Sequence, residues 1–362
     1  MNYQTTFTNA KQQLNFDLDY ARFSSDQLQR NANSYYDSTG IMVGDIEQFS
    51  NNNPREINVY SVKADYKQPL WKDAMLESGV KIGQTTTDND LKFEEFSGNA
   101  WQINYGKSNR FVYTEQISAA YLNVNQKLEQ FSFQVGLRGE YTNTNGNQKT
   151  TGDVNNKTYF NLFPTFFVNY QALPKHNFGF SYSRRISRPN FDVLNPFELT
   201  VDAYSFFSGN PDLMPSYTHN VELSHSTGTL MSRVGYSNTS DMIFQAPIVD
   251  EITQRTGYIW RNFGKCQDVS AMLNYRRQIV KIWTANLTLL GVYQVNTSDE
   301  ALGEFVSKGS TAKVQLSNNF TITPSLSAEV SGLLCIGYAY WIFHIQILWK
   351  SFSRLSTDAV ER

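Results

Sequence analysis

Residues 131 to 141 read Phe-Ser-Phe-Gln-Val-Gly-Leu-Arg-Gly-Glu-Tyr. Side chains alternate between the two faces of an extended strand, so Val135 and Leu137 fall on one face and Arg138 and Glu140 on the other. The stretch therefore has an apolar face and a charged face. This pattern predicts a β-strand that separates an apolar environment from a wet one.

The same alternation recurs along most of the chain. It is clearest in residues 176–186 and 283–295 and weaker in residues 326–330. We count about fourteen candidate strands, many of which approach the roughly 9–11 residues that a tilted membrane strand requires. Polar stretches such as 51–54 and 144–147 lie between the candidate strands, and their Asn, Gly and Pro content predicts turns.

The composition fits strands with one wet and one apolar face. Aromatic residues make up 14% of the chain and charged residues only 18%, below the roughly 25% charged residues typical of soluble domains. Mean hydropathy is nevertheless -0.44, because the chain is rich in Asn, Gln, Ser and Thr. A transmembrane β-barrel has this arrangement, with a polar lumen and an apolar lipid-facing side. A soluble β-sandwich is the alternative that the pattern alone leaves open.

Several functional classes have no support in the sequence. The net charge is -2, which gives no electrostatic reason to expect nucleic acid as a partner. Cys266 and Cys335 lie far apart, so we expect isolated thiols and neither a zinc site nor a disulfide framework. The histidines are scattered, and no phosphate-binding loop or nucleophile motif is present, so we expect no metal, no cofactor and no enzyme activity.

No apolar run is long enough to predict a membrane-spanning helix of roughly 20 residues. The first seven residues, Met-Asn-Tyr-Gln-Thr-Thr-Phe, also lack the basic region and apolar stretch of a signal peptide. The alternation already begins near residue 11. We therefore expect this start to be interior to a longer gene product.

Four short motifs occur in a fixed order in the middle of the chain. Residues 182–189 read Tyr-Ser-Arg-Arg-Ile-Ser-Arg-Pro, and 194–197 read Leu-Asn-Pro-Phe. Residues 209–215 then read Gly-Asn-Pro-Asp-Leu-Met-Pro, and 217–223 read Tyr-Thr-His-Asn-Val-Glu-Leu. This succession resembles the barrel region of the TonB-dependent receptors and related outer-membrane β-barrel proteins of the Bacteroidetes type. With the surrounding alternation, the resemblance covers about residues 10 to 332.

The resemblance implies an all-β fold, an antiparallel transmembrane β-barrel located in the outer membrane of a Gram-negative bacterium. About fourteen strands are fewer than the 22 of a plugged transporter barrel, and we find no plug domain in the sequence, so we expect an incomplete barrel that lacks its plug. The implied partners are outer-membrane lipid and, only if a full-length protein exists, a plug domain and TonB.

The motif region is expected to be a long extracellular loop between two barrel strands. Its prolines lack the backbone donor that a central strand needs, and its Asn-Pro and Gly-Asn-Pro steps are typical of turns. The residues of this loop that carry the resemblance are Asn195, Pro196, Phe197, Gly209, Asn210, Pro211 and Pro215.

Three arginines form the most compact basic group of the chain. Arg185 shares the parity of small polar residues and is expected to face the lumen, whereas Arg184 is expected near the lipid interface with its stem snorkelling. We interpret Arg185 and Arg188 as contacts for an anionic substrate or for a plug. The alternative is that they are solvated or bonded within the loop.

The alternation ends after Val330. From Leu333 to Trp349, apolar residues occupy both parities, so a strand there would have no polar face. We interpret residues 1–332 as a partial outer-membrane β-barrel and residues 333–362 as an aberrant tail. A shifted reading frame or a degraded gene would produce such a tail, and an atypical buried or membrane-inserting segment is the alternative.

The leading functional hypothesis from the sequence is a fragment of a TonB-dependent receptor barrel that imports a bulky nutrient. The first alternative is a plugless barrel with a structural or passive-pore role. The second is a soluble, secreted β-protein that binds glycans.

Overall fold

The computed structural model describes residues 1–7, 12–202, 204–250, 255–262, 264–298, 306–337 and 340–349. Within these ranges the chain is almost entirely β-strand, and the one helix, α1 (Phe191–Leu194), has four residues. No helix of the described ranges is long and apolar enough to cross a membrane.

Most strands belong to one 18-stranded sheet with antiparallel pairing. Three of them, β3, β4 and β7, form a side extension, and the other fifteen follow one another as an up-and-down meander. These are β1 (Asn2–Thr6), β2 (Gln13–Ser25), β5 (Arg55–Pro69), β6 (Ala74–Ser97), β8 (Asn109–Leu128), β9 (Phe131–Gln148), β10 (Val154–Leu173), β11 (His176–Ser187), β14 (Ser216–Ser226), β15 (Leu230–Ser240), β18 (Lys265–Val280), β19 (Trp283–Thr297), β20 (Val306–Thr323), β21 (Leu326–Ile336) and β22 (Tyr340–Trp349).

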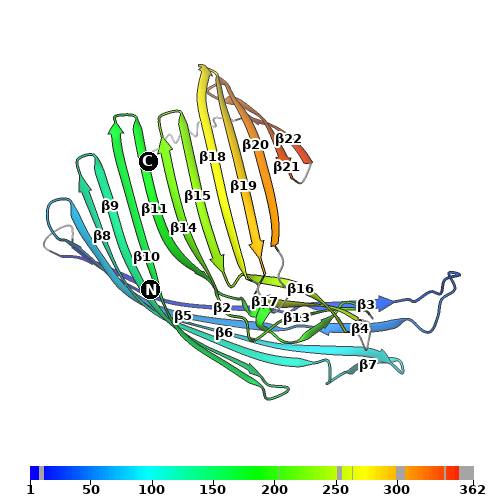
Figure 1. Cartoon of the computed structure of the whole chain (residues 1–362). Helices are drawn as coiled ribbons and strands as arrows, with labels where there is room; N and C mark the ends of the chain where they lie inside the picture. Colours follow the sequence, from blue (N-terminus) through cyan, green and yellow to red (C-terminus); the bar gives the residue numbers. More distant parts are fainter. Residues whose placement is uncertain are drawn as a thin grey trace, which may run out of the picture.

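The meander is curved, and its connections differ at the two ends (Figure 1). Most connections at one end have two to four residues, for example two between β8 and β9 and four between β5 and β6. Long connections lie at the other end, as in outer-membrane barrels with short periplasmic turns and long extracellular loops. Among the described residues, β1 does not pair with β22, so these two strands are the edges of an open sheet.

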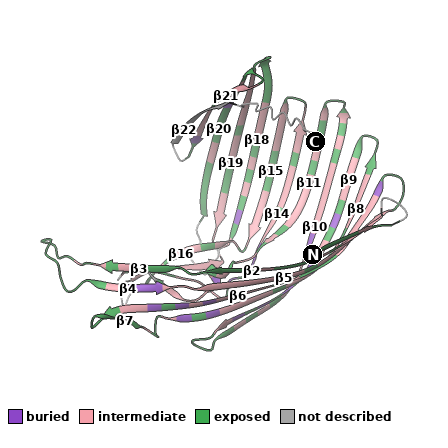
Figure 2. Cartoon of the chain, turned by 180° about the vertical axis from the view of Figure 1, so that it is seen from behind, coloured by how far each residue is buried: buried purple, intermediate pink, exposed green. Residues whose placement is uncertain are grey.

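The side extension, which we call the arm, is built on the last residues of β6, beyond the part of that strand that pairs in the meander. It consists of β3 (Leu28–Asn33), β4 (Glu47–Asn52) and β7 (Ala100–Ile103), which pair with one another or with the last residues of β6. Phe49 and Phe93 stack inside the arm with ring centroids 5.3 Å apart and are almost completely buried. Buried residues gather in β4, β6, β8 and β9, whereas most residues of the other strands are intermediate or exposed (Figure 2).

Two long connections combine into a second, four-stranded sheet, which we call the loop sheet. The connection after β11 supplies β12 (Glu198–Thr200) and β13 (Ser205–Ser208), and the connection after β15 supplies β16 (Ile243–Asp250) and β17 (Arg255–Asn262). β13 and β17 are parallel, and the other neighbours are antiparallel. The loop sheet lies beside the arm at the end of the long connections (Figure 1).

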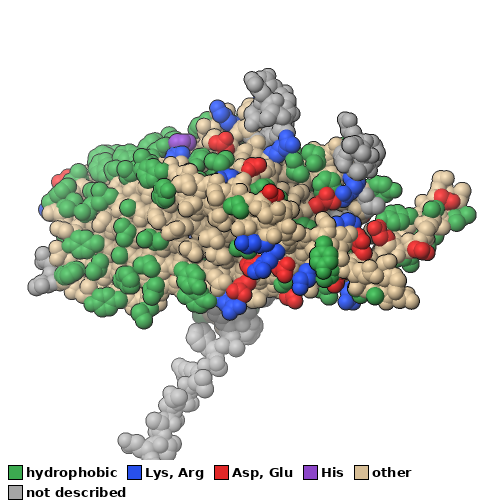
Figure 3. Space-filling view, turned by 90° about the horizontal axis from the view of Figure 1, so that it is seen from below, with side chains coloured by type: hydrophobic (Ala, Val, Ile, Leu, Met, Phe, Trp, Pro, Cys, Tyr) green, Lys and Arg blue, Asp and Glu red, His purple; other side chains and the backbone are tan. Residues whose placement is uncertain are grey.

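Aromatic side chains mark two borders on the outer face of the meander. Phe131 and Tyr141 on β9, Phe160 and Tyr170 on β10, and Trp283 and Tyr293 on β19 are each ten residues apart. In the register, Phe160 lies opposite Tyr141 and Tyr170 opposite Phe131, so the rings form rows across strands. Ten residues at about 3.4 Å, tilted by about 40°, span roughly 25 Å, which is the height of the apolar band of a membrane barrel. The face seen in Figure 3 is apolar over one half and charged over the other.

The turn predicted at residues 144–147 is wrong. Thr144 lies within β9 and pairs with Glu115 on one side and Lys157 on the other. Asn51 and Asn52, predicted in a turn, likewise lie in β4. Hydrogen bonding to neighbouring strands overrides the local turn preference of Asn and Gly in both places.

The segment after residue 332 continues the sheet. β21 extends to Ile336, and β22 pairs with it over Tyr340–Trp349. Residues 350–362 lie outside the described residues. The shifted reading frame that we infer from the sequence stays a prediction.

Candidate functional site on the inner face

The chain that leaves β11 does not extend away from the sheet as a free loop. Residues 188–197, which we call the strap, cross the inner face of the meander toward β5. Arg188 begins the strap, and its guanidinium donates to Glu140 Oε2 at 2.6 Å and to Thr142 Oγ1 at 3.0 Å. Glu115 on β8 lies 3.8 Å from the same guanidinium. Arg188 is thus held against β8 and β9 by two carboxylates and a hydroxyl.

Helix α1 forms the middle of the strap. The Asn190 side chain accepts a hydrogen bond from the backbone N–H of Val193 at 3.1 Å, which caps the helix. Phe191 packs on Phe111 of β8 with ring centroids 5.4 Å apart. Such contacts fix the strap to the inner face by apolar burial as well as by charge.

Asn195, the first loop residue of the family motif, is a polar anchor between strands. Its Oδ1 accepts from Asn109 Nδ2 at 3.2 Å and from the Phe197 backbone N–H at 3.3 Å. Its Nδ2 donates to Asn89 Oδ1 at 3.4 Å. The Pro196 carbonyl accepts from Ser208 at 3.1 Å, which ties the strap to the loop sheet.

The second half of the motif folds back on the strap. The Gly209 N–H donates to the Asn195 carbonyl at 3.0 Å, and a Cβ at Gly209 would lie only 2.2 Å from that oxygen. Only glycine fits this approach. Asn210 donates from its backbone to the Val193 carbonyl at 2.7 Å and from its side chain to the Trp260 carbonyl at 3.0 Å.

The prolines of the motif end this folded connection. Lys157 on β10 donates to the carbonyls of Pro211 and Leu213 at 2.5 and 2.7 Å. Leu213 and Pro215 are fully buried, and Leu213 packs with Phe111 and Leu194. The predicted extracellular loop thus lies at the end of the long connections, but it is a packed element that contacts the inner wall.

A hollow of about 690 Å³ lies on the inner face beside the start of the strap. Arg138, Glu140 and Arg185 line it together with the apolar Phe163 and Phe167. Arg138 donates to Glu140 at 2.5 Å, so Glu140 joins Arg138 and Arg188. Arg185 is exposed and has no ion-pair partner among the described residues. The two arginines predicted as contacts thus differ, since Arg188 is engaged and Arg185 is available.

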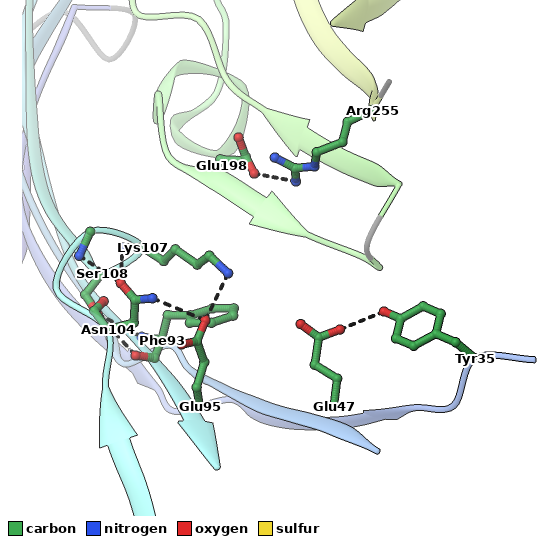
Figure 4. Close-up of polar contacts among 10 residues, drawn as sticks. Tyr35, Glu47, Phe93, Glu95, Asn104, Lys107, Ser108, Glu198 and Arg255 are labelled. Carbon is green, nitrogen blue, oxygen red and sulfur yellow. Dashed lines mark hydrogen bonds and ion pairs between the residues drawn. The ribbon is translucent and has the colours of Figure 1, made fainter. Parts of the chain in front are cut away.

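A second polar group lies where the arm faces the loop sheet (Figure 4). Tyr35 donates to Glu47 at 2.7 Å, and this hydrogen bond raises the pKa of Tyr35. Lys107 donates to Glu95 at 3.0 Å and lowers the pKa of that carboxyl. Lys107 also lies over the Phe93 ring at 4.7 Å.

The loop sheet contributes the Glu198–Arg255 ion pair, at 2.6 Å, to the same region. The Arg255 guanidinium also lies 4.7 Å from the Phe206 ring centre. None of these groups was predicted from the sequence, because their partners are far apart in the chain and carry no motif.

We find no cluster of metal-binding side chains in the described part of the chain. No group of three or more His, Cys, Asp and Glu side chains there could hold a metal ion. Cys266 and Cys335 are free and buried. His176 and His225 hydrogen-bond to each other at 3.1 Å, and His219 bonds to Tyr182 at 2.9 Å.

Comparison with known proteins gives the family of the chain. A sequence model of the outer membrane protein beta-barrel family matches residues 5–343. No curated protein sequence matches the chain. Among solved structures, the chain is similar to the FrpB iron transporter from Neisseria meningitidis, with 11% identity and a TM-score of 0.55, covering 96% of this chain and 64% of that one.

Two further solved structures share the fold at the same TM-score of 0.55. The ferripyoverdine receptor of Pseudomonas aeruginosa is 12% identical, with 96% of this chain and 55% of that chain covered. The ferric-catecholate import receptor Fiu from E. coli K12 is 9% identical, with 92% and 58% covered. The chain spans between about half and two thirds of the length of these receptors. It is all-β, its wall has the antiparallel architecture of outer-membrane receptor barrels, and it belongs to the outer membrane protein β-barrel family, whose place is the outer membrane of a Gram-negative cell.

Proposed function

We propose that the chain forms the wall of a TonB-dependent receptor that imports a bulky nutrient through the outer membrane. The observation that carries the proposal is the inner face, where the family motif folds inward as a strap beside a charged hollow. A polar lumen is common to transmembrane barrels, so the proposal rests on the inward fold of the motif and on Arg185, which lines the hollow beside it without an ion-pair partner among the described residues. The plug and TonB are the partners that this function requires.

Iron bound to a siderophore is the first nutrient to test. The solved structures that share the fold include an iron transporter, a ferripyoverdine receptor and a ferric-catecholate import receptor. Arg185 is the residue that we propose to contact an anionic ligand or the plug, because it lines the hollow without a carboxylate partner. Arg188, bound to Glu140, is proposed to position the strap from which such a contact is made.

Uptake in the cell that carries the chain tests this proposal. Labelled ferric catecholate would be supplied to cells with the unchanged gene, with Arg185→Glu, and with TonB removed. We expect uptake to stop without TonB and to fall about tenfold with Arg185→Glu, the loss typical of one charge-assisted contact. Arg277→Glu, at an exposed position near the short turns, is the matched control and should leave uptake unchanged.

A passive pore gives the opposite result. Uptake would then continue without TonB and would fall only when the external concentration falls. That outcome would reject the receptor hypothesis in favour of a plugless barrel that acts as a passive pore. Unchanged uptake with Arg185→Glu, in cells where TonB is required, would reject Arg185 as a contact and leave the receptor in place.

A further inference from the structure

The wall of the main sheet has a seam between β10 and β11. The two strands pair up to Thr165 and Ser183 and no further. Beyond that pair, β10 continues to Val154 paired only with β9, and β11 continues to Ser187 paired only with β14. Pro164 follows the last pair on β10, and proline has no N–H with which to extend the ladder. The strands therefore part on the side of the long connections.

Arg184 fills this seam. Its Nη1 donates to the Leu162 carbonyl at 2.6 Å, and its Nη2 lies 3.4 Å from Asn161 Oδ1. The guanidinium lies over the Tyr217 ring at 4.6 Å and the Phe163 ring at 5.6 Å. All these partners are neutral, and Arg184 forms no ion pair within the described part of the chain. The snorkelling Arg184 expected from the sequence instead substitutes for missing backbone bonds.

The described side chains that surround Arg184 at the seam include no carboxylate, and at the inner end of the seam Arg184 also lines the hollow that contains Glu140. His219 is its cross-strand partner on β14 and shares a hydrogen bond of 2.9 Å with the Tyr182 hydroxyl. Asn161 donates to the Tyr217 hydroxyl at 3.0 Å. Guanidinium, hydroxyl and amide groups together supply the donors that a phosphate group accepts.

An apolar hollow of about 790 Å³ lies next to this polar group on the outer face. Ala120 and Gly139 are cross-strand partners. Because both are small, they leave a depression in the sheet surface between the larger side chains of Leu137 and Phe160. Leu162 pairs with Gly139 and lines the hollow, and its carbonyl holds Arg184. The hollow and the arginine are therefore adjacent.

The depth of Arg184 suits a lipid headgroup. Phe160 belongs to the aromatic border on the side of the long connections, and Leu162 lies two residues, or about 5 Å, inside it. We propose that Arg184, with Tyr217 and His219, binds the phosphate of an anionic membrane lipid whose acyl chain lies in the hollow over Gly139. The bound phosphate supplies the ion-pair partner that Arg184 lacks among the described residues.

Lipid retention by the purified full chain tests the site. The chain in non-ionic detergent would be mixed with equal amounts of phosphatidylglycerol and phosphatidylcholine of the same acyl chains, and the retained lipid measured by native mass spectrometry. We expect phosphatidylglycerol to be retained about tenfold more than phosphatidylcholine. Arg184→Gln should abolish that preference, and Arg184→Lys should reduce it, because lysine keeps the charge but lacks the planar fork.

Ala120→Leu tests the acyl-chain site separately, because it fills the hollow and leaves every polar group in place. Retention of both lipids should fall. Arg22→Gln, an outer-face arginine already paired with Glu56 at 2.7 Å, is the control and should retain lipid as the unchanged chain does. Protection from trypsin would confirm that each variant keeps the fold.

Two results would overturn the proposal. One is a phosphatidylglycerol preference that survives Arg184→Gln in a variant with normal trypsin protection. The other is displacement of phosphatidylglycerol by millimolar inorganic phosphate together with no effect of Ala120→Leu, which would show a site for free phosphate and not for a lipid. Neither result bears on TonB-dependent uptake, so this proposal and the proposed function can fail independently.

Discussion

The orientation of the sheet predicts that a charge introduced on its outer face destabilises the chain much more than a charge introduced on its inner face. Leu137 on β9 is 48% exposed on the outer face, four residues from the Tyr141 border and six from Phe131. Four residues at about 3.4 Å with a tilt of about 40° place it about 10 Å inside the apolar band. Gln134 points to the inner face and lines the charged hollow.

Leu137→Arg should therefore destabilise the chain by about 2–3 kcal/mol, within the range of about 2–4 kcal/mol measured for arginine near the midplane of a barrel. Gln134→Arg should cost less than about 1 kcal/mol, because the new charge lies in a polar surface. Leu287→Arg and Thr288→Arg form the same pair on β19. Since Leu287 lies four residues from Trp283 and six from Tyr293, it has a similar depth.

Denaturant unfolding of the chain in lipid vesicles, followed by tryptophan fluorescence, measures these differences. The control is Leu137→Met, which keeps an apolar side chain of similar volume and should cost little. Equal destabilisation by the inner and outer arginines would refute the assignment of the outer face to lipid.

Three further predictions concern the family motif, the strap and the arm. Gly209→Ala should destabilise the motif by about 1–3 kcal/mol, because the added Cβ would lie 2.2 Å from the Asn195 carbonyl, and limited proteolysis of the connection would show it. Glu140→Gln should cost about 2 kcal/mol in unfolding experiments because it leaves Arg188 without its closest carboxylate, and a double-mutant cycle with Arg188→Met that gave no coupling would contradict this. The lowered pKa of Glu95 means that its ion pair stabilises the arm above the unfolded pKa of about 4.3, and that this contribution disappears as pH falls through the folded value. Amide exchange in residues 92–108 should therefore accelerate below pH 4, and exchange that does not change with pH beyond its intrinsic rate would reject the effect.

Much of the strand pattern could be predicted from the sequence, and the motif region shows where prediction stopped. The alternation in residues 131–141 gave both the strand and its two faces. The prolines of 189–215 correctly indicated an interruption of the sheet. They could not indicate that the interruption folds inward, because the contacts of Asn195 with Asn89 and Asn109 join residues 106 and 86 positions apart.

Arg188 and Arg184 illustrate the same limit. Arg188 was predicted as a contact for a substrate or plug, but no local pattern indicated that it would pair with Glu140, 48 residues away. Pro164 was visible as a residue unable to donate a backbone bond. Its consequence depended on which strand would lie beside it, and so the seam filled by Arg184 was not predicted.

By itself the sequence determined the fold class, the strand faces and the family, because these depend on period-two alternation and on short motifs that local chemistry fixes. The tertiary structure alone decided which polar groups meet. The register in which two strands pair determines which residues, often far apart in the sequence, lie opposite each other along the whole length of the pair. The available charge of Arg185, the engaged charge of Arg188 and the seam at Arg184 follow from that register. All three lie within a few residues of one another in the sequence, and only their neighbours in space distinguish them.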